Sequence, residues 1–265
     1  MSEGLPQFLV PDWPVAARVR AAVTLRTGGV SHGPYASLNL AAHVGDRPAD
    51  VAENRRRAHA ALSLPAEPLW LTQVHGTRVI DADTSEIAAA AQDPAAQEVA
   101  FRPPQADAAV TRQTGRVLAV MVADCLPVLL ARADGAAIAV AHAGWRGLAA
   151  GVLEAAVSAL GTAPEALRAW LGPAIGPAHF EVGAEVRSAF CDHDAGALAA
   201  FAPNERGRWQ CDLPALARRR LAALGLTSVH GDSPCTFSHP ERFYSYRREQ
   251  VTGRFAALLW MDPNA

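Results

Sequence analysis

Short apolar runs, separated by turn-forming residues, recur along the chain and predict β-strands. The runs are rich in Val, Ile, Leu and Ala, and Gly, Pro or Asp interrupts them before they reach the length of a typical helix. The predicted strands are Ala21–Thr27, Leu69–Val74, Val79–Ala82, Ala106–Thr111, Val117–Val122, Val128–Ala131, Ala136–Ala141, Ala169–Gly172 and Arg254–Trp260.

Other segments mix apolar and polar residues in the manner of surface helices. The predicted helices are Asp50–Leu62, Gly147–Leu160, Gly183–Phe190 and Pro214–Leu224. The stretch Val30–Arg47 is long, irregular and rich in Ser, Gly, Pro and Asn, and loops of this length are often functional. The Ala-rich and then Pro-rich stretch Ser85–Pro104 predicts a surface excursion, and the chain from Val229 to the last strand predicts a loop region.

The order of these elements predicts the fold class. Strands and helices are mixed without the regular βαβ alternation of a parallel sheet. We therefore expect an α/β fold with helical layers around a mixed sheet, in a single domain over residues 1–265. With 265 residues and 50% hydrophobic residues, the chain can bury one sizeable core.

Composition excludes several partners. A formal net charge of -2 argues against nucleic acid or an anionic membrane as the main partner. The first ten residues show no basic segment followed by an apolar run, so we expect no signal peptide. The longest apolar stretch, Val117–Ala131, contains Asp124 and Pro127 and is shorter than the roughly 20 residues that a membrane helix needs. We expect a cytoplasmic monomer or homodimer.

Cysteine and lysine usage narrows the chemistry. The four cysteines form no Cys-x-x-Cys pair, so we expect reduced thiols. All 24 basic residues are arginine, which excludes Schiff-base, pyridoxal-phosphate and Walker lysines. Any phosphate or carboxylate would therefore be held by arginine or by backbone N–H groups.

Two histidines and one cysteine stand in unusual company. His75 follows an apolar strand, Cys125 lies inside the most apolar region, and His142 ends a strand ahead of a glycine-containing turn. Imidazole and thiolate ligands suit zinc or copper, and three protein ligands leave a fourth position open, as in catalytic sites. Their spacing is not that of a zinc finger, so the sequence leaves open that each is a satisfied core residue.

Two arginines are candidate anion contacts. Arg146 lies in a Gly-Trp-Arg-Gly turn that opens a predicted helix, where free N–H groups and the helix dipole favour an anion. The alternative is a surface arginine on the first turn of that helix. Arg26 precedes Gly28 and Gly29 and could be a second contact, or a solvated arginine at a strand end.

Other polar residues are weaker candidates, some with more than one interpretation. Asp124, beside Cys125, could be a general base, could orient a metal ligand, or could make a structural hydrogen bond. Asn39 could touch a ligand from the long loop or simply form a turn. Residues that could line a pocket near the C-terminus are Cys235, Arg247 and Arg248. The histidines interpreted as bystanders are His179, His193, His230 and His239.

At these residues the chain resembles a known family. It is similar to bacterial members of the YfiH or laccase-domain family, also called the multicopper polyphenol oxidase or purine nucleoside phosphorylase family. The matching segments, which run in order from about Val23 to the C-terminus, are Thr27–Ser31, Ser37–Leu40, His43–Asp46, Gln73–Gly76, Ala106–Ala108, Ala123–Cys125, Ala141–Gly147, Leu171–Gly176 and Tyr244–Arg248.

The resemblance implies a layered α-β-β-α fold and a zinc site made by His75, Cys125 and His142, with copper as an alternative ion. It implies purine nucleosides and phosphate as substrates. The activities that it implies are phosphorolysis of adenosine, inosine and methylthioadenosine, and deamination of adenosine. The three metal ligands and Asp124 would then be the catalytic group.

Phosphate and nucleoside would then be held by Arg146, with Arg26 and Asn39 as further candidates.

Two other functions stay open. Similar proteins have been called copper polyphenol oxidases, but four-copper chemistry uses about eight histidines, mostly in His-x-His pairs. This chain has nine histidines and no such pair. The third function is a cysteine hydrolase with Cys125 as nucleophile, which would fit a role in editing peptidoglycan precursors.

Overall fold

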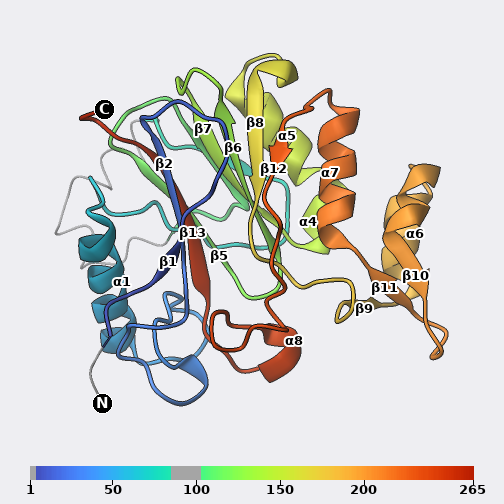
Figure 1. Ribbon diagram of the computed structural model, residues 1–265, viewed down its shortest axis with the longest axis horizontal. Helices are drawn as coiled ribbons and strands as arrows, with labels where there is room; N and C mark the ends of the chain where they lie inside the picture. Colours follow the sequence, from blue (N-terminus) through green and yellow to red (C-terminus); the bar gives the residue numbers. More distant parts are fainter. Residues whose placement is uncertain (1–3, 85–102) are drawn as a thin grey trace.

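Two β-sheets stand face to face at the centre of the molecule (Figure 1). The computed structural model describes residues 4–84 and 103–265. The first sheet is antiparallel, with the strand order β1-β2-β13-β5. Its strands are β1 (Phe8–Leu9), β2 (Val19–Thr24), β5 (Val117–Val122) and β13 (Phe255–Met261).

The second sheet is mixed, with the order β12-β8-β6-β7-β4-β3. The outer pairs β3–β4 and β12–β8 are parallel, and the inner pairs are antiparallel. Its strands are β3 (Val79–Asp81), β4 (Ala108–Thr111), β6 (Leu126–Arg132), β7 (Ile138–Ala143), β8 (Leu167–Leu171) and β12 (Val229–His230). A small separate sheet is formed by β9 (Glu181–Val182), β10 (Phe201–Pro203) and β11 (Trp209–Cys211).

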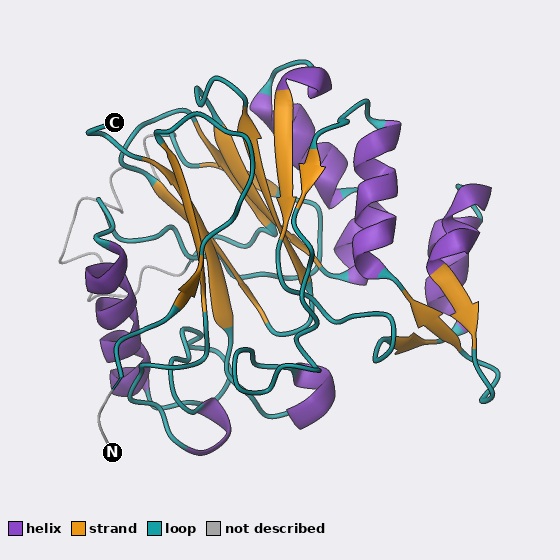
Figure 2. Cartoon of the chain, viewed as in Figure 1, coloured by secondary structure: helices purple, strands orange, loops and turns teal. Residues whose placement is uncertain are grey.

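Helices cover both outer faces, as Figure 2 shows. One long helix packs on the four-stranded sheet, and three helices pack on the six-stranded sheet. These helices are α1 (Pro48–Leu62) on the first face and α4 (Trp145–Ala150), α5 (Val152–Leu160) and α7 (Leu213–Ala223) on the second. Within residues 4–84 and 103–265, the other helical segments are η1 (Gly33–Tyr35), η2 (Pro164–Ala166), α6 (Ala184–Cys191), η3 (Ala195–Ala200) and α8 (Tyr246–Glu249). The expected α-β-β-α layering is confirmed.

Burial on both faces explains the continuous apolar runs of the central strands. Strands β5, β7 and β13 are buried at every residue, because one face packs on the opposite sheet and the other on helices or loops. Leu118 and Val120 of β5 meet Ile138 and Val140 of β7 in the core between the sheets. A strand enclosed in this way shows no alternation of polar and apolar residues.

The single helix predicted over Gly147–Leu160 is wrong, because two helices occupy this stretch. Gly151 ends α4 and precedes α5 with φ at 103°, a left-handed conformation that glycine tolerates and other residues rarely adopt. The chain therefore turns after only six residues of α4. This break separates Trp145 and Arg146, at the start of α4, from the longer helix α5. The sequence predicted one long helix whose dipole would act at these two residues.

The other differences concern short elements. The expected strand Leu69–Val74 makes only isolated bridges, from Leu69 to Leu118 and from Thr72 to Gln105. The strands β1, β9, β10, β11 and β12 were not predicted, because two or three residues are too few for a hydrophobic pattern. The region after Val229 also contains the short helix α8. The expected excursion Ser85–Pro104 lies outside the described residues except for its last two.

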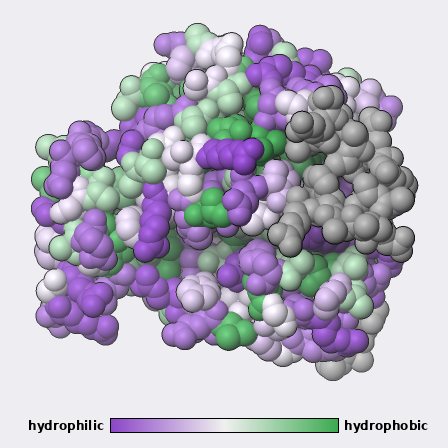
Figure 3. Space-filling view, turned by 180° about the vertical axis from the view of Figure 1, so that it is seen from behind, coloured by the Kyte–Doolittle hydropathy of each residue, from purple (hydrophilic) through white to green (hydrophobic). Residues whose placement is uncertain are grey.

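One face of the molecule carries no single large patch of one kind of residue among its described residues (Figure 3). Polar and apolar residues are interspersed over the described part of the face seen in Figure 3. Among the described residues, no helix has the length and apolar content needed to cross a membrane.

Candidate metal centre

His75, Cys125 and His142 converge at one end of the central strands, and we call them the metal cluster. Cys125 lies in the turn between β5 and β6, and His142 lies in β7. The pairing of β6 with β7 brings these two residues together. The Cys125 Sγ lies 3.7 Å from Nε2 of His75, and the two imidazole rings are 4.8 Å apart. The three possible ligand atoms all lie within 4.8 Å of one another.

This separation fits a tetrahedral metal ion. Zinc bonds of about 2.3 Å to sulfur and about 2.0 Å to nitrogen, at a tetrahedral angle, place those two atoms about 3.6 Å apart. The observed Sγ–Nε2 distance of 3.7 Å matches that edge. The donor set of two imidazoles and one thiolate is also one that zinc and copper accept. The metal cluster can therefore hold a metal ion.

Asp107 organises the metal cluster from behind. Its carboxylate is fully buried, and Oδ1 lies 2.8 Å from Nδ1 of His142. The same carboxylate accepts the backbone N–H groups of Val74, His75 and Gly76 at 3.2, 2.9 and 2.7 Å. A proton on Nδ1 of His142 leaves Nε2 free as a ligand, the usual arrangement of carboxylate, histidine and metal. Asp107 thus positions two of the three ligands.

Sequence reasoning missed this role. Asp107 was noticed only as part of a matching segment, although an acid flanked by buried alanines at the start of an apolar strand is itself a signal.

The turn that carries His75 is also held by the side chain of Gln73, which bonds to the backbone of β5. The side-chain amide of Gln73 donates to the carbonyl oxygen of Met121 at 2.7 Å and accepts from its N–H at 2.8 Å. The amide therefore replaces a backbone pair between this segment and β5. His75 itself has φ at 60°, a conformation that these anchors hold in place.

Gly144 allows the close approach of the three ligands. A Cβ at Gly144 would lie 2.7 Å from Cδ2 of His75 and 3.0 Å from Sγ of Cys125. The first distance is shorter than real side-chain contacts, and the second is tighter than nearly all of them. Glycine at this position is therefore a requirement of the metal cluster, not only of the turn.

Cys125 and His142 each stabilise the charged form of the other. Burial alone would raise the pKa of the Cys125 thiol, but the charge and hydrogen bonds of His142 and His75 lower it to about 6. Burial alone would lower the pKa of His142, but Cys125 and Asp107 raise it to about 9. Without a metal, thiolate and imidazolium therefore pair at neutral pH. Thiolate is the form of cysteine that binds metals and attacks electrophiles.

A pocket of about 600 Å³ opens onto the metal cluster. Its walls combine aromatic and aliphatic side chains with three arginines. Besides the metal cluster, its lining includes His43, Gln73, Asp124, Trp145, Arg146, Ile175, Phe180, Leu213, Tyr246, Arg247 and Arg254. A second pocket of about 630 Å³ lies against α1 and contains no member of the metal cluster. The pocket at the metal cluster therefore combines the reactive groups with room for a small molecule.

Arg146 lines this pocket from the start of α4. Its exposed guanidinium stacks over the ring of Trp145 at 4.5 Å. Within the described residues, the guanidinium has no hydrogen bond and no acidic partner. It is thus available to an anion, although the six-residue α4 supplies little of the helix dipole that the sequence suggested.

Asp124 reaches the pocket wall, but its carboxylate is already used. Oδ1 accepts from the hydroxyl of Thr236 at 2.6 Å, and Oδ2 accepts from the backbone N–H of Arg247 at 2.7 Å. Its backbone has φ at 98°. These contacts favour the structural reading of Asp124, which ties α8 and the Thr236 segment to the turn that carries Cys125.

The structure does not bring Arg26 or Asn39 into the pocket lining. Asn39 is fully buried, and its Oδ1 accepts the backbone N–H groups of Ala41 and Arg254. Arg26 pairs with Glu249 at 3.3 Å and donates to two backbone carbonyls. Both residues instead hold the chain segment that runs from α8 into β13, in which Arg254 lies.

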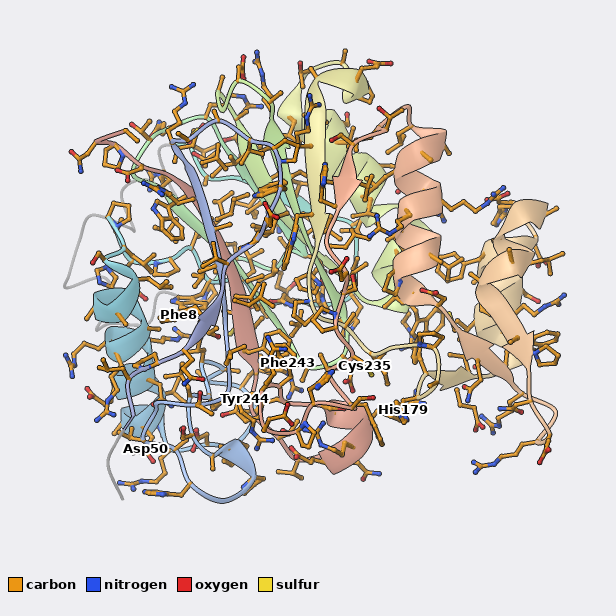
Figure 4. All side chains as sticks on the ribbon, in the orientation of Figure 1. Phe8, Asp50, His179, Cys235, Phe243 and Tyr244 are labelled. Carbon is orange, nitrogen blue, oxygen red and sulfur yellow. The ribbon has the colours of Figure 1, made fainter. Side chains whose placement is uncertain are left out.

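Of the remaining candidate residues, one lines the pocket and the others do not. Arg247 lines the pocket, whereas Arg248 bonds to backbone carbonyls and to Glu249. Cys235 and His179 lie near α8 in Figure 4 and are not part of the pocket lining; His179 stacks on Phe237 at 4.2 Å. Arg254 is a pocket residue that sequence reasoning passed over, because it stood at the edge of a predicted strand.

Comparisons with known proteins each cover nearly the whole chain. Residues 20–262 match the family model for multi-copper polyphenol oxidoreductase laccase. A Pseudomonas aeruginosa protein named purine nucleoside phosphorylase is 51% identical and is aligned over 96% of this chain and 98% of its own length. The Escherichia coli protein named purine nucleoside phosphorylase YfiH is 47% identical, over 97% of this chain and 100% of its own.

Solved structures share the fold. A Neisseria meningitidis protein of family DUF152 has a TM-score of 0.86 at 43% identity, covering 96% of this chain and 99% of its own. YlmD from Geobacillus stearothermophilus has a TM-score of 0.83 at 30% identity, covering 97% and 99%.

Proposed function

The chain belongs to the family described as multi-copper polyphenol oxidoreductase laccase, and we propose that it is a metal-dependent purine nucleoside phosphorylase. Two relatives that align over nearly their whole length, at 51% and 47% identity, carry the name purine nucleoside phosphorylase. The observation that carries the proposal is the metal cluster at the base of a pocket that also contains arginines and apolar walls.

We propose zinc as the ion, with copper as an alternative, held by His75, Cys125 and His142. The separation of the ligand atoms and the mixed nitrogen and sulfur donors support this assignment. When bound, the ion supplies Lewis-acid chemistry next to the substrate. Asp107 keeps the proton of His142 on Nδ1, which leaves Nε2 free to bind the ion.

The rest of the pocket suits a nucleoside and phosphate. Trp145, Phe180 and Tyr246 offer aromatic faces for a purine, and Arg146 offers a guanidinium that no acid occupies among the described residues. In phosphorolysis, a phosphate oxygen bonds to C1′ of the ribose as the bond from C1′ to the purine nitrogen breaks. The products are ribose 1-phosphate and the free base, which takes up a proton.

We propose adenosine, inosine and methylthioadenosine as substrates, with deamination of adenosine as a side activity. In deamination, water replaces the purine amino group and ammonia leaves. The same pocket can serve both reactions, because they share the nucleoside and differ in the second reactant.

Two alternatives make different demands on the same residues. Polyphenol oxidation by four coppers would need a second group of ligands, and the described residues contain one cluster of three or more possible ligands. A cysteine hydrolase would use the Cys125 thiolate with His142, and the lowered pKa of the thiol fits that chemistry as well as metal binding. The two readings of Cys125 differ in whether activity needs a metal.

Product analysis tests the proposal. We expect purified protein to contain about one zinc per chain, and adenosine plus phosphate to yield adenine and ribose 1-phosphate. Adenosine without phosphate should yield only inosine. Absence of free base at every phosphate concentration would contradict the phosphorylase assignment, whatever the deaminase result.

A further inference from the structure

Arg254 enters the pocket of the metal cluster from a rigidly held backbone. Its N–H donates to Oδ1 of the buried Asn39 at 2.9 Å, and its carbonyl oxygen accepts from the N–H of Leu40 at 3.1 Å. One end of its guanidinium, Nη1, donates to the carbonyl oxygens of Thr252 and Gly253 at 2.9 and 3.0 Å. The side chain is therefore fixed before any ligand arrives.

The other end of this guanidinium is free for a ligand. Within the described residues, Nε and Nη2 of Arg254 have no hydrogen-bond partner, and neither nitrogen is among the buried unpaired polar atoms. They must therefore reach the solvent of the pocket that Arg254 lines. Nε and one Nη form the edge of the guanidinium that binds phosphate or carboxylate with two parallel hydrogen bonds.

The charge of Arg254 is poorly compensated inside the protein. Within 4 Å, no carboxylate of the described residues pairs with it, whereas Arg26 and Arg248 on the same side of the molecule both pair with Glu249. Burial lowers the pKa of Arg254, and the negative charges of Cys125 and Asp124, neither of which forms an ion pair with it, oppose this effect. A half-buried cation without an ion-pair partner is costly unless a ligand supplies the anion.

From this geometry we propose that Arg254 is the principal phosphate-binding residue of the pocket, with Arg146 as a second and weaker contact. This inference rests on the proposed phosphorylase function, because it assigns the site of its second substrate. Arg254 is pre-organised by backbone contacts, so binding orders little of its side chain. Arg146 is exposed and screened by solvent, so its contact is worth less.

The assignment also explains Asn39. From the sequence, Asn39 was a candidate either for touching a ligand or for forming a turn, and in the structure its Oδ1 accepts the backbone N–H of Arg254. Asn39 is then a positioning residue for the anion site. The ligand contact itself belongs to the arginine.

Phosphate affinity of the metal-loaded protein tests the inference. The variants are Arg254→Gln and Arg254→Lys, and Arg55→Gln is the matched control. Arg55 is also half-buried, donates to the carbonyl oxygen of Leu40 at 3.0 Å and stacks on Trp70 at 4.1 Å, but lines the other pocket. Two quantities are measured for each protein: the Kd of inorganic phosphate by calorimetry, and the KM for phosphate at saturating adenosine.

We expect Arg254→Gln to raise both phosphate constants about ten- to a hundredfold, as loss of a two-bond charge-assisted contact requires. The KM for adenosine and the zinc content should change less than about twofold. Arg254→Lys should recover part of the phosphate affinity, because lysine keeps the charge and loses the fork. Arg55→Gln should leave both phosphate constants unchanged.

Several outcomes would overturn the inference. One is an unchanged phosphate affinity in Arg254→Gln, and another is an equal rise of the adenosine and phosphate constants, which a merely structural arginine would give. If Arg254→Gln does not fold, Arg254→Lys decides, and wild-type phosphate affinity in that variant refutes the site. If the wild-type protein binds phosphate through Arg254 but releases no purine, the anion site stands and the phosphorylase function fails.

Discussion

Replacing Asp107 by Asn removes one charge and tests whether this buried carboxylate holds the metal cluster together. In the structure, Oδ1 accepts from Nδ1 of His142 at 2.8 Å and from the N–H of His75 at 2.9 Å. The second oxygen, Oδ2, accepts the N–H groups of Val74 and Gly76 at 3.2 and 2.7 Å. Asparagine has the same shape, but its amide nitrogen is a donor, so either orientation leaves two of these four donors without an acceptor.

The size of the effect follows from these contacts. Hydrogen bonds to a charged group contribute about 1.5–3 kcal/mol each, so losing two should lower the free energy of unfolding by about 3 kcal/mol or more. Removing a carboxylate behind a ligating histidine typically weakens metal binding about ten- to a hundredfold. Although burial opposes ionisation of Asp107, the hydrogen bonds from His142 and Gly76 keep its pKa below the usual value, so the carboxylate is charged at neutral pH.

Zinc competition titrations with a chromophoric chelator measure the loss of metal affinity, and urea unfolding of the metal-free protein measures the loss of stability. The matched control is Asp81→Asn on the neighbouring strand β3, where an exposed pair with Arg112 contributes about 0–1 kcal/mol. Wild-type zinc affinity in Asp107→Asn, with wild-type unfolding, would refute the positioning role of this carboxylate.

Three further predictions concern the same pocket. Alkylation of Cys125 in metal-free protein, measured by peptide mass analysis, should rise with pH through a midpoint near 6, because His142 stabilises the thiolate. The variant His142→Gln should move that midpoint up. Cys211, whose pKa burial raises to about 12, should stay unlabelled. A midpoint above about 8 in the wild type would contradict this pairing. Arg146→Ala should slow phosphate-dependent cleavage about two- to fivefold and leave deamination unchanged, since water needs no guanidinium; equal loss of both rates would remove Arg146 from the site. Gly144→Ala should weaken zinc binding at least tenfold, because the new methyl group would lie 2.7 Å from a ligand histidine; normal zinc affinity would show that the turn can move.

The hydrophobic pattern predicted most of the layered core and missed what depends on single residues. Strands β5 and β13 were found because burial on both faces makes their sequences continuously apolar. The break at Gly151 was missed because glycine is also tolerated inside helices, and only its left-handed φ of 103° ends α4. Two-residue strands such as β9 carry no period, so sequence could not reveal them.

The candidate site shows the same division. His75, Cys125 and His142 stood out because polar ligands at the ends of apolar strands are conspicuous, and the structure brings them together. Asp107 and Arg254 did not stand out, because their importance lies in contacts between segments far apart in the chain. A single sequence shows which residue types lie at the ends of predicted strands. It does not show which side chains contact one another in the folded protein.

Metal removal and replacement test the central claim most directly. Adenine release from adenosine and phosphate is measured in protein as purified, after stripping by chelation, and after reloading with zinc. Our account predicts that stripping abolishes adenine release, that one equivalent of zinc restores it, and that His75→Ala cannot be restored. Full activity of the stripped protein, sensitive to alkylation of Cys125, would contradict the metal-dependent phosphorylase and support a cysteine enzyme.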